Sequence, residues 1–403
     1  MSLPPSADPP PSGGVPLDRR SLAPDLARGV MLLVIATVHA HIFHQMAGGG
    51  QAHPLGGTLD AATTVFMLMF AEARGYPMFA ALFGYGLARI HLRRVAAGHT
   101  RSEVRALVRR RGRWMVLIGL LHTVLLFFGD VIAVYGLIAL LFAGLLHVGD
   151  RRLLAHGFTW MALGTLAYAV LNTVPSFTDA ESGQVLTASP TADMVTRLLT
   201  WPVMTPMLLM TSVFPFVVGV WAARRRLMEE PEHHLGLLRR TAFLGIPAAA
   251  LGGLPYALAS ARIWEPAGAW ETGAAWLHLL TGYAGGFGYA ALIALAAVRL
   301  GRRRGPIVQA LAATGQRSMT CYLLQSVGWM VLFMPYTLDL ASRLSDIGSV
   351  LVGAAVWLTT VVIADAMRRT GTRGPAERLL RRGTYRGARS ATAADQGRAH
   401  SGV

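Results

Sequence analysis

The sequence predicts an all-α, polytopic transmembrane helix bundle of about ten spans, with both termini in the cytoplasm. Hydrophobic residues make up 53% of the 403-residue chain and charged residues only 14%, which is typical of a protein embedded in a bilayer. Apolar stretches long enough to cross a membrane recur along the chain. The basic residues, all of them arginine, gather in short clusters in every second connection between these stretches, as expected for cytoplasmic loops.

Ten apolar stretches are candidate spans: 27–46, 61–89, 114–129, 131–148, 154–174, 199–222, 241–260, 275–298, 307–334 and 347–366. The third and fourth are short and are separated only by Gly129 and Asp130. We therefore expect a tight hairpin between them.

The second stretch is too long and too interrupted for one simple span. Glu72, Arg74, Gly75 and Pro77 lie near its middle, and Pro77 removes a helix hydrogen bond. We expect a broken helix here, which is tolerated at membrane depth only where it is buried in protein or lines a cavity.

Arginine placement fixes the predicted orientation. Clusters precede the first span, fill the connection over 89–113, recur in every second later loop, and follow the last span over 368–386. Ten spans with both ends in the cytoplasm satisfy this alternation, whereas an odd number would place a basic cluster outside. The formal charge of +16 therefore reflects topology and does not indicate nucleic-acid binding, which would need one basic face or tail.

Outside the bundle, predicted over 19–386, we expect two disordered tails, 1–18 and 387–403. The first is rich in Pro, Ser and Gly, a composition typical of disorder, and lacks the basic start and short apolar core of a secretory signal. Cys321 is the only cysteine, so no internal disulfide can form.

Two histidines are candidate catalytic residues because of their predicted depth. His39 follows Arg28 by eleven residues, or roughly 16 Å along a helix. This places Arg28 at the cytoplasmic interface and His39 near the middle of a hydrocarbon core about 30 Å thick. His122, in the third span, lies at a similar height. Ionisable residues inside a span are costly and by default suggest function.

A second set of polar residues is predicted mostly toward the outer half of the membrane: Glu72, Arg74, Asp130, Gln325 and Ser326. Asp130 is expected at the outer end of the third span. Arg74 should form an ion pair with Asp130 or Glu72, since an unpaired arginine at that depth would cost several kcal/mol. We interpret the set as a structural or acceptor-side polar cluster.

Structural interpretations remain open for these residues. His39 and His122 are also compatible with core histidines that bond to backbone carbonyls, and Gln325 and Ser326 with interhelical hydrogen bonds. The four-residue spacing of the pair Gly282 and Gly286 favours close helix packing.

The histidines His39, His41, His44 and His53 raise the question of metal binding. His41 and His44 share a helix face, but His39 is rotated off it. No Cys, Asp or Glu lies nearby at a ligand spacing, so we predict no metal site.

Several motifs together resemble the YeiB-like bacterial membrane proteins, which are domain of unknown function family 418. They are Arg74-Gly-Tyr-Pro-Met-Phe79, Gly119-Leu-Leu-His122 with Gly129-Asp130-Val-Ile-Ala-Val-Tyr135, Gly315-Gln-Arg317 through Gln325-Ser326, and Gly374-Pro375-Ala-Glu377-Arg378. The resemblance runs from residue 25 to 386, with the C-terminal family domain at about 220–386. It implies a multi-pass protein of the bacterial cytoplasmic (inner) membrane.

The YeiB-like family is in turn similar to a wider superfamily of transmembrane acyltransferases, which includes heparan-glucosaminide N-acetyltransferases and acyltransferase-3 proteins. In the acyltransferase-3 group, an arginine of the first span precedes a histidine by eleven positions, and Arg28 and His39 stand at that spacing. The resemblance implies transfer of an acyl group from cytoplasmic acyl-CoA to a membrane, glycan or cell-envelope acceptor, without a tightly bound cofactor.

In that interpretation, Arg28, Arg109, Arg110 and Arg113 would contact the donor's phosphates, which guanidinium groups bind through paired hydrogen bonds. The last three also fit topology signalling and contact with anionic lipid. His39 would act as a general base or as a transient acyl carrier. Two other classes stay open: a transporter of small molecules or lipids, which a polar-lined bundle with a broken helix also fits, and a non-catalytic membrane assembly protein.

Overall fold

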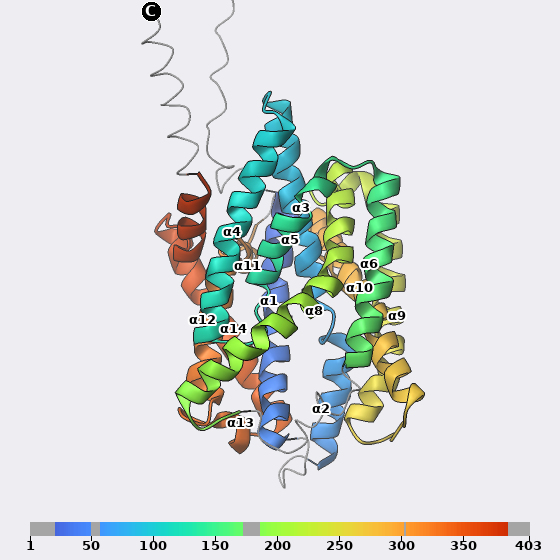
Figure 1. The fold of residues 1–403 in the computed structure, drawn as a ribbon, viewed down its shortest axis with the longest axis vertical. Coiled ribbons are helices and arrows are strands. Elements are labelled where there is room, and N and C mark those ends of the chain that lie inside the picture. The colour runs from blue at the N-terminus through green and yellow to red at the C-terminus, as the bar shows by residue number, and fades with distance from the viewer. Residues whose placement is uncertain (1–20, 50–56, 172–185, 302–303, 386–403) are drawn as a thin grey trace, which may run out of the picture.

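The computed structural model describes residues 21–49, 57–171, 186–301 and 304–385, and all regular elements in these residues are helices (Figure 1). This confirms the predicted all-α class. The predicted tails and His53 lie outside the described residues. The elements are α1 (Leu22–His44), η2 (Gln45–Gly49), α2 (Gly57–Phe70), α3 (Gly75–Ala96), α4 (Arg101–Leu125), α5 (Ile132–Leu141), η3 (Ala143–His147), α6 (Asp150–Leu171), α8 (Pro190–Arg224), η5 (Pro231–His234), α9 (Leu235–Ser260), α10 (Ala269–Leu300), α11 (Pro306–Gln316), α12 (Ser318–Phe333), α13 (Leu340–Arg343) and α14 (Asp346–Arg369).

Among the described residues, seven helical stretches are long and apolar enough to cross a membrane: Leu22–Ala47, Gly57–Ala96, Asp150–Val170, Pro190–Arg224, Pro231–Ser260, Ala269–Leu300 and Asp346–Arg369. Two shorter apolar helices, α5 and α12, accompany them. The chain is therefore an integral membrane protein. The number of spans and the side on which the termini lie stay predictions.

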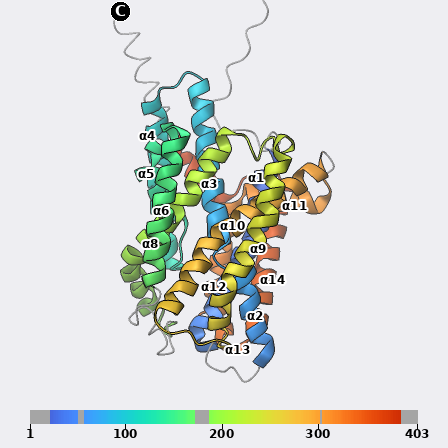
Figure 2. The same cartoon turned by 90° about the vertical axis from the view of Figure 1, so that its right-hand side faces the viewer.

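Helix α1 runs through the middle of the bundle, between helices of the N-terminal and C-terminal halves (Figures 1 and 2). It packs against α3, α10, α11, α12 and α14. Leu32, Ala36 and Ala40 are fully buried along its length. The first span therefore contributes a fully buried apolar stretch to the interior of the bundle.

The second predicted span is broken where the sequence indicated. Helix α2 ends at Phe70 and α3 begins at Gly75, with Ala73 between them at a positive φ of 56°. The hydroxyl of Tyr289 donates to the Phe70 carbonyl at 2.6 Å, satisfying one of the carbonyls that the break leaves open. Pro77 lies in the first turn of α3, where a missing N–H costs no helix hydrogen bond.

A second break was not predicted. The apolar stretch 307–334 is divided at Arg317 into α11 and α12, although the local sequence contains no Pro at that point. The partners that hold this break come from more than fifty residues further along the chain, so the local pattern does not reveal it.

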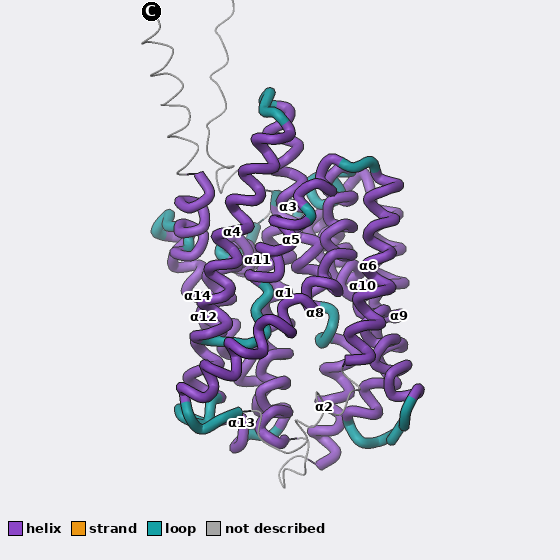
Figure 3. The backbone as a smooth tube through the Cα atoms, in the orientation of Figure 1, coloured by secondary structure: helices purple, strands orange, loops and turns teal. Residues whose placement is uncertain are grey.

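The α4–α5 hairpin lies at a different depth from the one predicted. A turn at Gly129 and Asp130 is present, but it lies between the two ends of the bundle and not at its outer face (Figure 3). Helix α5 has ten residues, about 15 Å of helix, or half of a hydrocarbon core. Phe127 and Asp130 in the turn are each only 2% exposed. The expectation that Asp130 caps the outer end of a span is therefore wrong. Helix α4 begins at Arg101, before the predicted apolar stretch 114–129, and the chain turns back inside the bundle after α4 ends.

Glycines allow the closest helix contacts. A Cβ on Gly282 would lie 2.5 Å from the Ala73 carbonyl oxygen, and one on Gly286 would lie 2.9 Å from that of Arg74. The prediction of close packing at this pair is confirmed. Between α1 and α11 the approach is closer still, because a Cβ on Gly315 would lie 1.7 Å from the carbonyl oxygen of Asp25.

The substitution Gly315→Ala should therefore destabilise the protein by about 1–3 kcal/mol, because backbone of α1 and α11 would have to separate. Thermal unfolding of the detergent-solubilised protein measures the effect. Gly273→Ala is the matched control, since nothing lies within 4 Å of its added methyl in α10. Equal melting temperatures for the two variants would contradict the close approach.

Candidate functional site

A buried chain of hydrogen bonds joins the α4–α5 hairpin to α12. His122 Nδ1 lies 2.8 Å from Asp130 Oδ1, and His122 Nε2 lies 2.8 Å from Ser326 Oγ. The three residues are at most 3% exposed. Because the carboxylate only accepts, Nδ1 carries the proton and donates to Asp130. The Ser326 hydroxyl lies 2.8 Å from His122 Nε2 and also 3.2 Å from the Tyr322 carbonyl oxygen, to which it donates.

Local structure fixes each member of this chain. His122 is in the last turn of α4, and Asp130 precedes α5, where its Oδ2 accepts from the Ala133 amide at 2.5 Å. This carboxylate therefore caps α5 while it orients His122. The Tyr322 hydroxyl donates to the Gly129 carbonyl at 3.2 Å. Ser326 lies one turn further along α12, so the same face of α12 holds both ends of the hairpin turn.

His39 lies against this chain. Its ring centroid is 4.4 Å from that of Phe127, in the hairpin turn, and 6.3 Å from that of Tyr322. The same two aromatic rings contact His122, at 6.4 and 5.1 Å. The two histidines predicted as catalytic, from different helices, thus share one site with Asp130 and Ser326.

The two histidines differ in their hydrogen bonding. Both ring nitrogens of His122 are bonded, whereas His39 Nδ1 is buried and has no hydrogen-bond partner among the described residues. The residue as a whole is partly exposed. Most buried polar atoms in proteins are paired, so an unpaired one calls for an explanation such as a catalytic role or a bound water.

Gln325 faces a different neighbour from Ser326. Its Nε2 donates to Thr360 Oγ1 of α14 at 3.4 Å, and it is 1% exposed. The structure therefore separates Gln325 from the His122 chain and gives it the role of an interhelical hydrogen bond.

Arg74 and Glu72 form another cluster, so of the two predicted partners Arg74 lies beside Glu72 and not beside Asp130. Asp130 is bonded to His122, while fully buried Arg74 donates to the carbonyl oxygens of Glu72 at 2.5 Å and Ala249 at 2.6 Å, and to His278 Nδ1 at 3.1 Å. The guanidinium thus bonds to the backbone of Glu72, whose carbonyl lies in the α2–α3 break, and to that of Ala249 in α9. His278 had no sequence signal, because it lies 204 residues from Arg74.

Of the arginines predicted to hold a donor, Arg110 and Arg113 line one pocket of about 420 Å³ beside Trp114, whereas Arg28 lies between α1 and α3. Arg28 donates to the Leu82 carbonyl at 3.1 Å and to Asp25 Oδ1 at 3.4 Å, so it ties α1 to α3. Arg109 and Arg113 are exposed on α4. Arg110 donates to the Thr384 carbonyl at 3.5 Å.

Two further histidines of α1 have structural partners. His41 Nδ1 lies 2.7 Å from Asp346 Oδ1, and His44 Nδ1 donates to the Ala341 carbonyl at 3.1 Å. In the part of the chain that the structure describes, no group of three or more His, Cys, Asp or Glu residues is placed to hold a metal ion.

The segment after α14 completes the α11–α12 break. Glu377 accepts from the amides of Met319 at 2.9 Å and Thr320 at 3.2 Å, at the start of α12. Arg317 donates to the Thr372 carbonyl at 2.6 Å. The motifs around Arg317 and Glu377, far apart in sequence, are thus two halves of one helix cap.

Comparison with family models gives one match, over residues 222–387, to the family described as "Protein of unknown function (DUF418)". The chain carries a DUF418 domain. This confirms the resemblance to the YeiB-like family for the C-terminal part of the chain, whereas the motifs around Arg74, His122 and Asp130 lie outside the match. No curated protein and no solved structure matches the chain. Ser326 and the Arg317–Glu377 cap belong to the DUF418 domain, whereas His39, His122 and Asp130 precede it. The buried site therefore needs both parts of the chain.

Replacement of Glu377 by Ala should lower stability by about 1–2 kcal/mol, because two amides at the start of α12 lose their acceptor. The melting temperature of the purified protein measures this. Glu265→Ala, which removes an exposed carboxylate between α9 and α10, serves as the charge-matched control. A Glu377→Ala variant that melts with the wild type would show that the cap is not needed.

Proposed function

We propose that this protein is a membrane-embedded acyltransferase that moves an acyl group from cytoplasmic acyl-CoA to a membrane, glycan or cell-envelope acceptor. The observation that carries the proposal is His39 Nδ1, which has no hydrogen-bond partner among the described residues and lies inside the bundle beside the Asp130–His122–Ser326 chain. A neutral imidazole with a free nitrogen has what a general base needs.

In the proposed reaction, His39 takes a proton from the acceptor's hydroxyl or amine as that atom attacks the thioester carbonyl. The new acyl–oxygen or acyl–nitrogen bond forms, the carbon–sulfur bond breaks, and the CoA thiolate takes the proton back from the His39 imidazolium. The acceptor is acylated, CoA leaves as the thiol, and His39 returns to its neutral form.

His122 has a positioning role in this scheme. Its bonds to Asp130 and Ser326 anchor the hairpin turn that carries Phe127, and the Phe127 ring contacts the His39 ring at 4.4 Å. The orientation of His39 thus depends on residues from three helical segments. Preorganisation of this kind is what lets one buried base act efficiently.

The donor would approach from the predicted cytoplasmic end. Arg109, Arg110 and Arg113 offer guanidinium groups for its phosphates there, whereas the Arg28 guanidinium bonds to Asp25 and to the Leu82 carbonyl within the protein. Acyl-CoA and the envelope acceptor are therefore the partners we propose.

The test is turnover of acetyl-CoA and longer acyl-CoAs by the full chain in proteoliposomes made from bacterial envelope lipids. We expect His39→Ala to lower kcat at least 100-fold, the usual loss on removal of a general base. His156→Ala, an exposed position of α6, should retain the wild-type rate. Absence of both acyl-CoA binding and turnover in folded wild-type protein would overturn the proposal.

A transporter is the second candidate, and the broken helices favour it specifically. Both α2–α3 and α11–α12 are interrupted at a buried arginine, Arg74 or Arg317. Discontinuous helices of this kind form the substrate sites of many transporters.

Movement of fluorescent phospholipid analogues between leaflets of the same proteoliposomes distinguishes the two classes. The acyltransferase proposal expects no acceleration without acyl-CoA. Protein-dependent movement that is retained in His39→Ala and needs no acyl-CoA would favour the transporter.

A further inference from the structure

Four titratable side chains lie near the predicted outer end of the bundle: Asp60 of α2, Glu72 in the α2–α3 break, His41 of α1 and Asp346 of α14. His41 and Asp346 are only 2% and 1% exposed, whereas Asp60 and Glu72 are partly exposed. Helix α2 and the short helix α13, which precedes Asp346, lie at the same end of the bundle (Figures 1 and 2). Acidic residues and histidines inside a membrane are typical of proton and ion pathways, and the proposed acyl transfer uses none of these four.

Hydrogen bonds keep Asp346 an ionised carboxylate. Its Oδ1 lies 2.7 Å from His41 Nδ1, its Oδ2 accepts from Thr64 Oγ1 at 2.9 Å, and its amide donates to Asp60 Oδ1 at 3.0 Å. Asp346 also lies in the first turn of α14, where the helix dipole favours negative charge. His41 Nδ1 therefore carries a proton and donates it to Asp346, because a carboxylate only accepts.

The other edge of the His41 ring has no such partner. His41 Nε2 makes no hydrogen bond among the described residues, although the residue is almost fully buried. The nearest negative charge besides Asp346 is the Glu72 carboxylate, which interacts electrostatically with His41 and also with Arg74. The Glu72 side chain likewise has no hydrogen bond within the described part of the chain, since Arg74 bonds to its carbonyl oxygen. An unpaired buried nitrogen thus lies beside an unpaired carboxylate.

His278 and Tyr256 are the remaining titratable groups around Glu72 and Arg74. Arg74 lies 3.1 Å from His278 Nδ1, which must accept the bond because a guanidinium only donates. His278 is therefore a neutral acceptor, and the Tyr256 ring packs on it at 4.9 Å. Neither residue supplies a positive charge.

Negative charge exceeds permanent positive charge in this cluster. Arg74 offsets the charge of Glu72, but Asp346 forms no ion pair with an arginine among the described residues, and His41 is its partner. A buried charge without a counter-ion is costly. One proton on His41 Nε2 makes the ring an imidazolium between two carboxylates and balances the charge.

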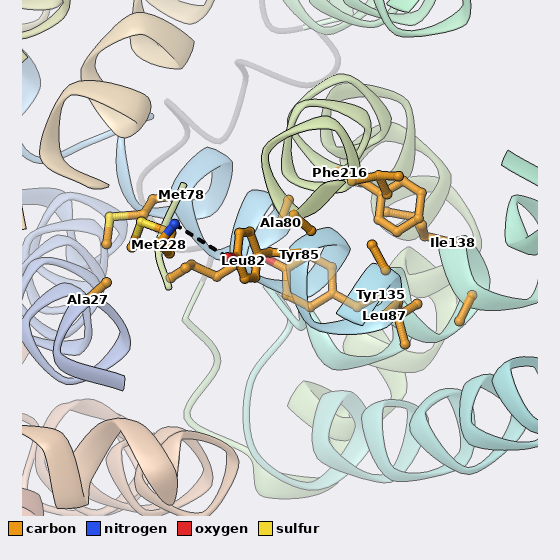
Figure 4. Close-up of a cluster of buried hydrophobic side chains, with 14 of the residues drawn as sticks. Ala27, Met78, Ala80, Leu82, Tyr85, Leu87, Tyr135, Ile138, Phe216 and Met228 are labelled. Carbon is orange, nitrogen blue, oxygen red and sulfur yellow. Dashed lines mark hydrogen bonds between the residues drawn. The ribbon is translucent and has the colours of Figure 1, made fainter. Parts of the chain in front are cut away.

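The helix that follows the break holds the site in place. Met78 and Leu82 of α3 are 0% and 3% exposed and pack in the main hydrophobic core with Tyr85 (Figure 4). On the other side of the break, the Tyr289 hydroxyl donates to the Phe70 carbonyl. Glu72 is therefore positioned by a packed frame, as a preformed binding site requires.

We infer that His41 and Glu72 form a binding site for one proton, which enters from the predicted outer end past Asp60. A hydronium ion gives its proton to His41 Nε2 and leaves as water, and release of the proton returns His41 to the neutral form. Asp346 is a positioning residue that orients the ring. This proton site is independent of the proposed acyl transfer, in which His39 is the base.

The first arm of the test is the pH dependence of the melting temperature of the full chain in neutral detergent. The folded protein would bind one more proton than the unfolded chain above about pH 6.5, where a free histidine loses its proton. Its stability should therefore fall as the pH rises. Glu72→Gln should remove at least half of this fall, because Arg74 then balances Asp346 without the proton.

Glu271→Gln, which removes an exposed carboxylate near the start of α10, is the matched control and should behave as the wild type. An unchanged pH dependence in Glu72→Gln would overturn the proton site, since the His41–Asp346 pair alone would then explain the titration. Sodium chloride is compared with choline chloride at constant pH. Stabilisation by sodium that is lost in Glu72→Gln would assign the site to a sodium ion and overturn it as well.

The second arm locates the proton by infrared difference spectra of the protein in nanodiscs, recorded below and above the same pH. We expect an imidazolium signal in the wild type that is absent in His41→Gln, weaker in Glu72→Gln and retained in Glu271→Gln. Wild-type and His41→Gln spectra that coincide would show that His41 does not take up the proton.

Discussion

The hydrogen-bond chain from Asp130 through His122 to Ser326 is the constraint on which the interior of this protein depends. It fixes the turn between α4 and α5 against α12, and the same turn brings Phe127 onto His39 of the central helix. Each polar atom in the chain has a partner, which offsets the cost of burying it. A hairpin that ends inside a membrane protein needs such an anchor, because its backbone has no water to bond to at that depth.

Two buried arginines provide hydrogen bonds to backbone groups elsewhere in the bundle. Arg74 donates to the carbonyl oxygens of Glu72 and Ala249, and Arg317 donates to those of Ala313 and Thr372. In both cases the guanidinium supplies donors to carbonyls at or near a helix break. The charge of these residues matters less here than the number and fan-like geometry of their N–H groups, which lysine does not offer.

Sequence patterns predicted the helical class, the first helix break and a similar depth for His39 and His122, because each follows from local composition or from counting residues along a helix. The pairings could not be predicted in that way. Counting residues along the helix places Asp130 at the outer face of the membrane only if α4 crosses the membrane completely. In the structure, the chain instead turns back inside the bundle after α4. The break at Arg317 depends on Glu377, and the environment of Arg74 depends on His278. Partners that lie so far apart in the sequence cannot be predicted from a short stretch of it.

The partnership of His122 with Ser326 also bears on the order in which the protein is made. The two residues lie 204 positions apart, and Ser326 belongs to the DUF418 domain whereas His122 does not. While the ribosome synthesises the intervening helices, the hairpin turn has no hydrogen bond to Ser326, because that residue has not yet been made. The boundary of the family match therefore falls between two residues that one buried hydrogen bond joins. A membrane chaperone or insertase would therefore have the most to protect at the stage when only the N-terminal half of the chain has been made.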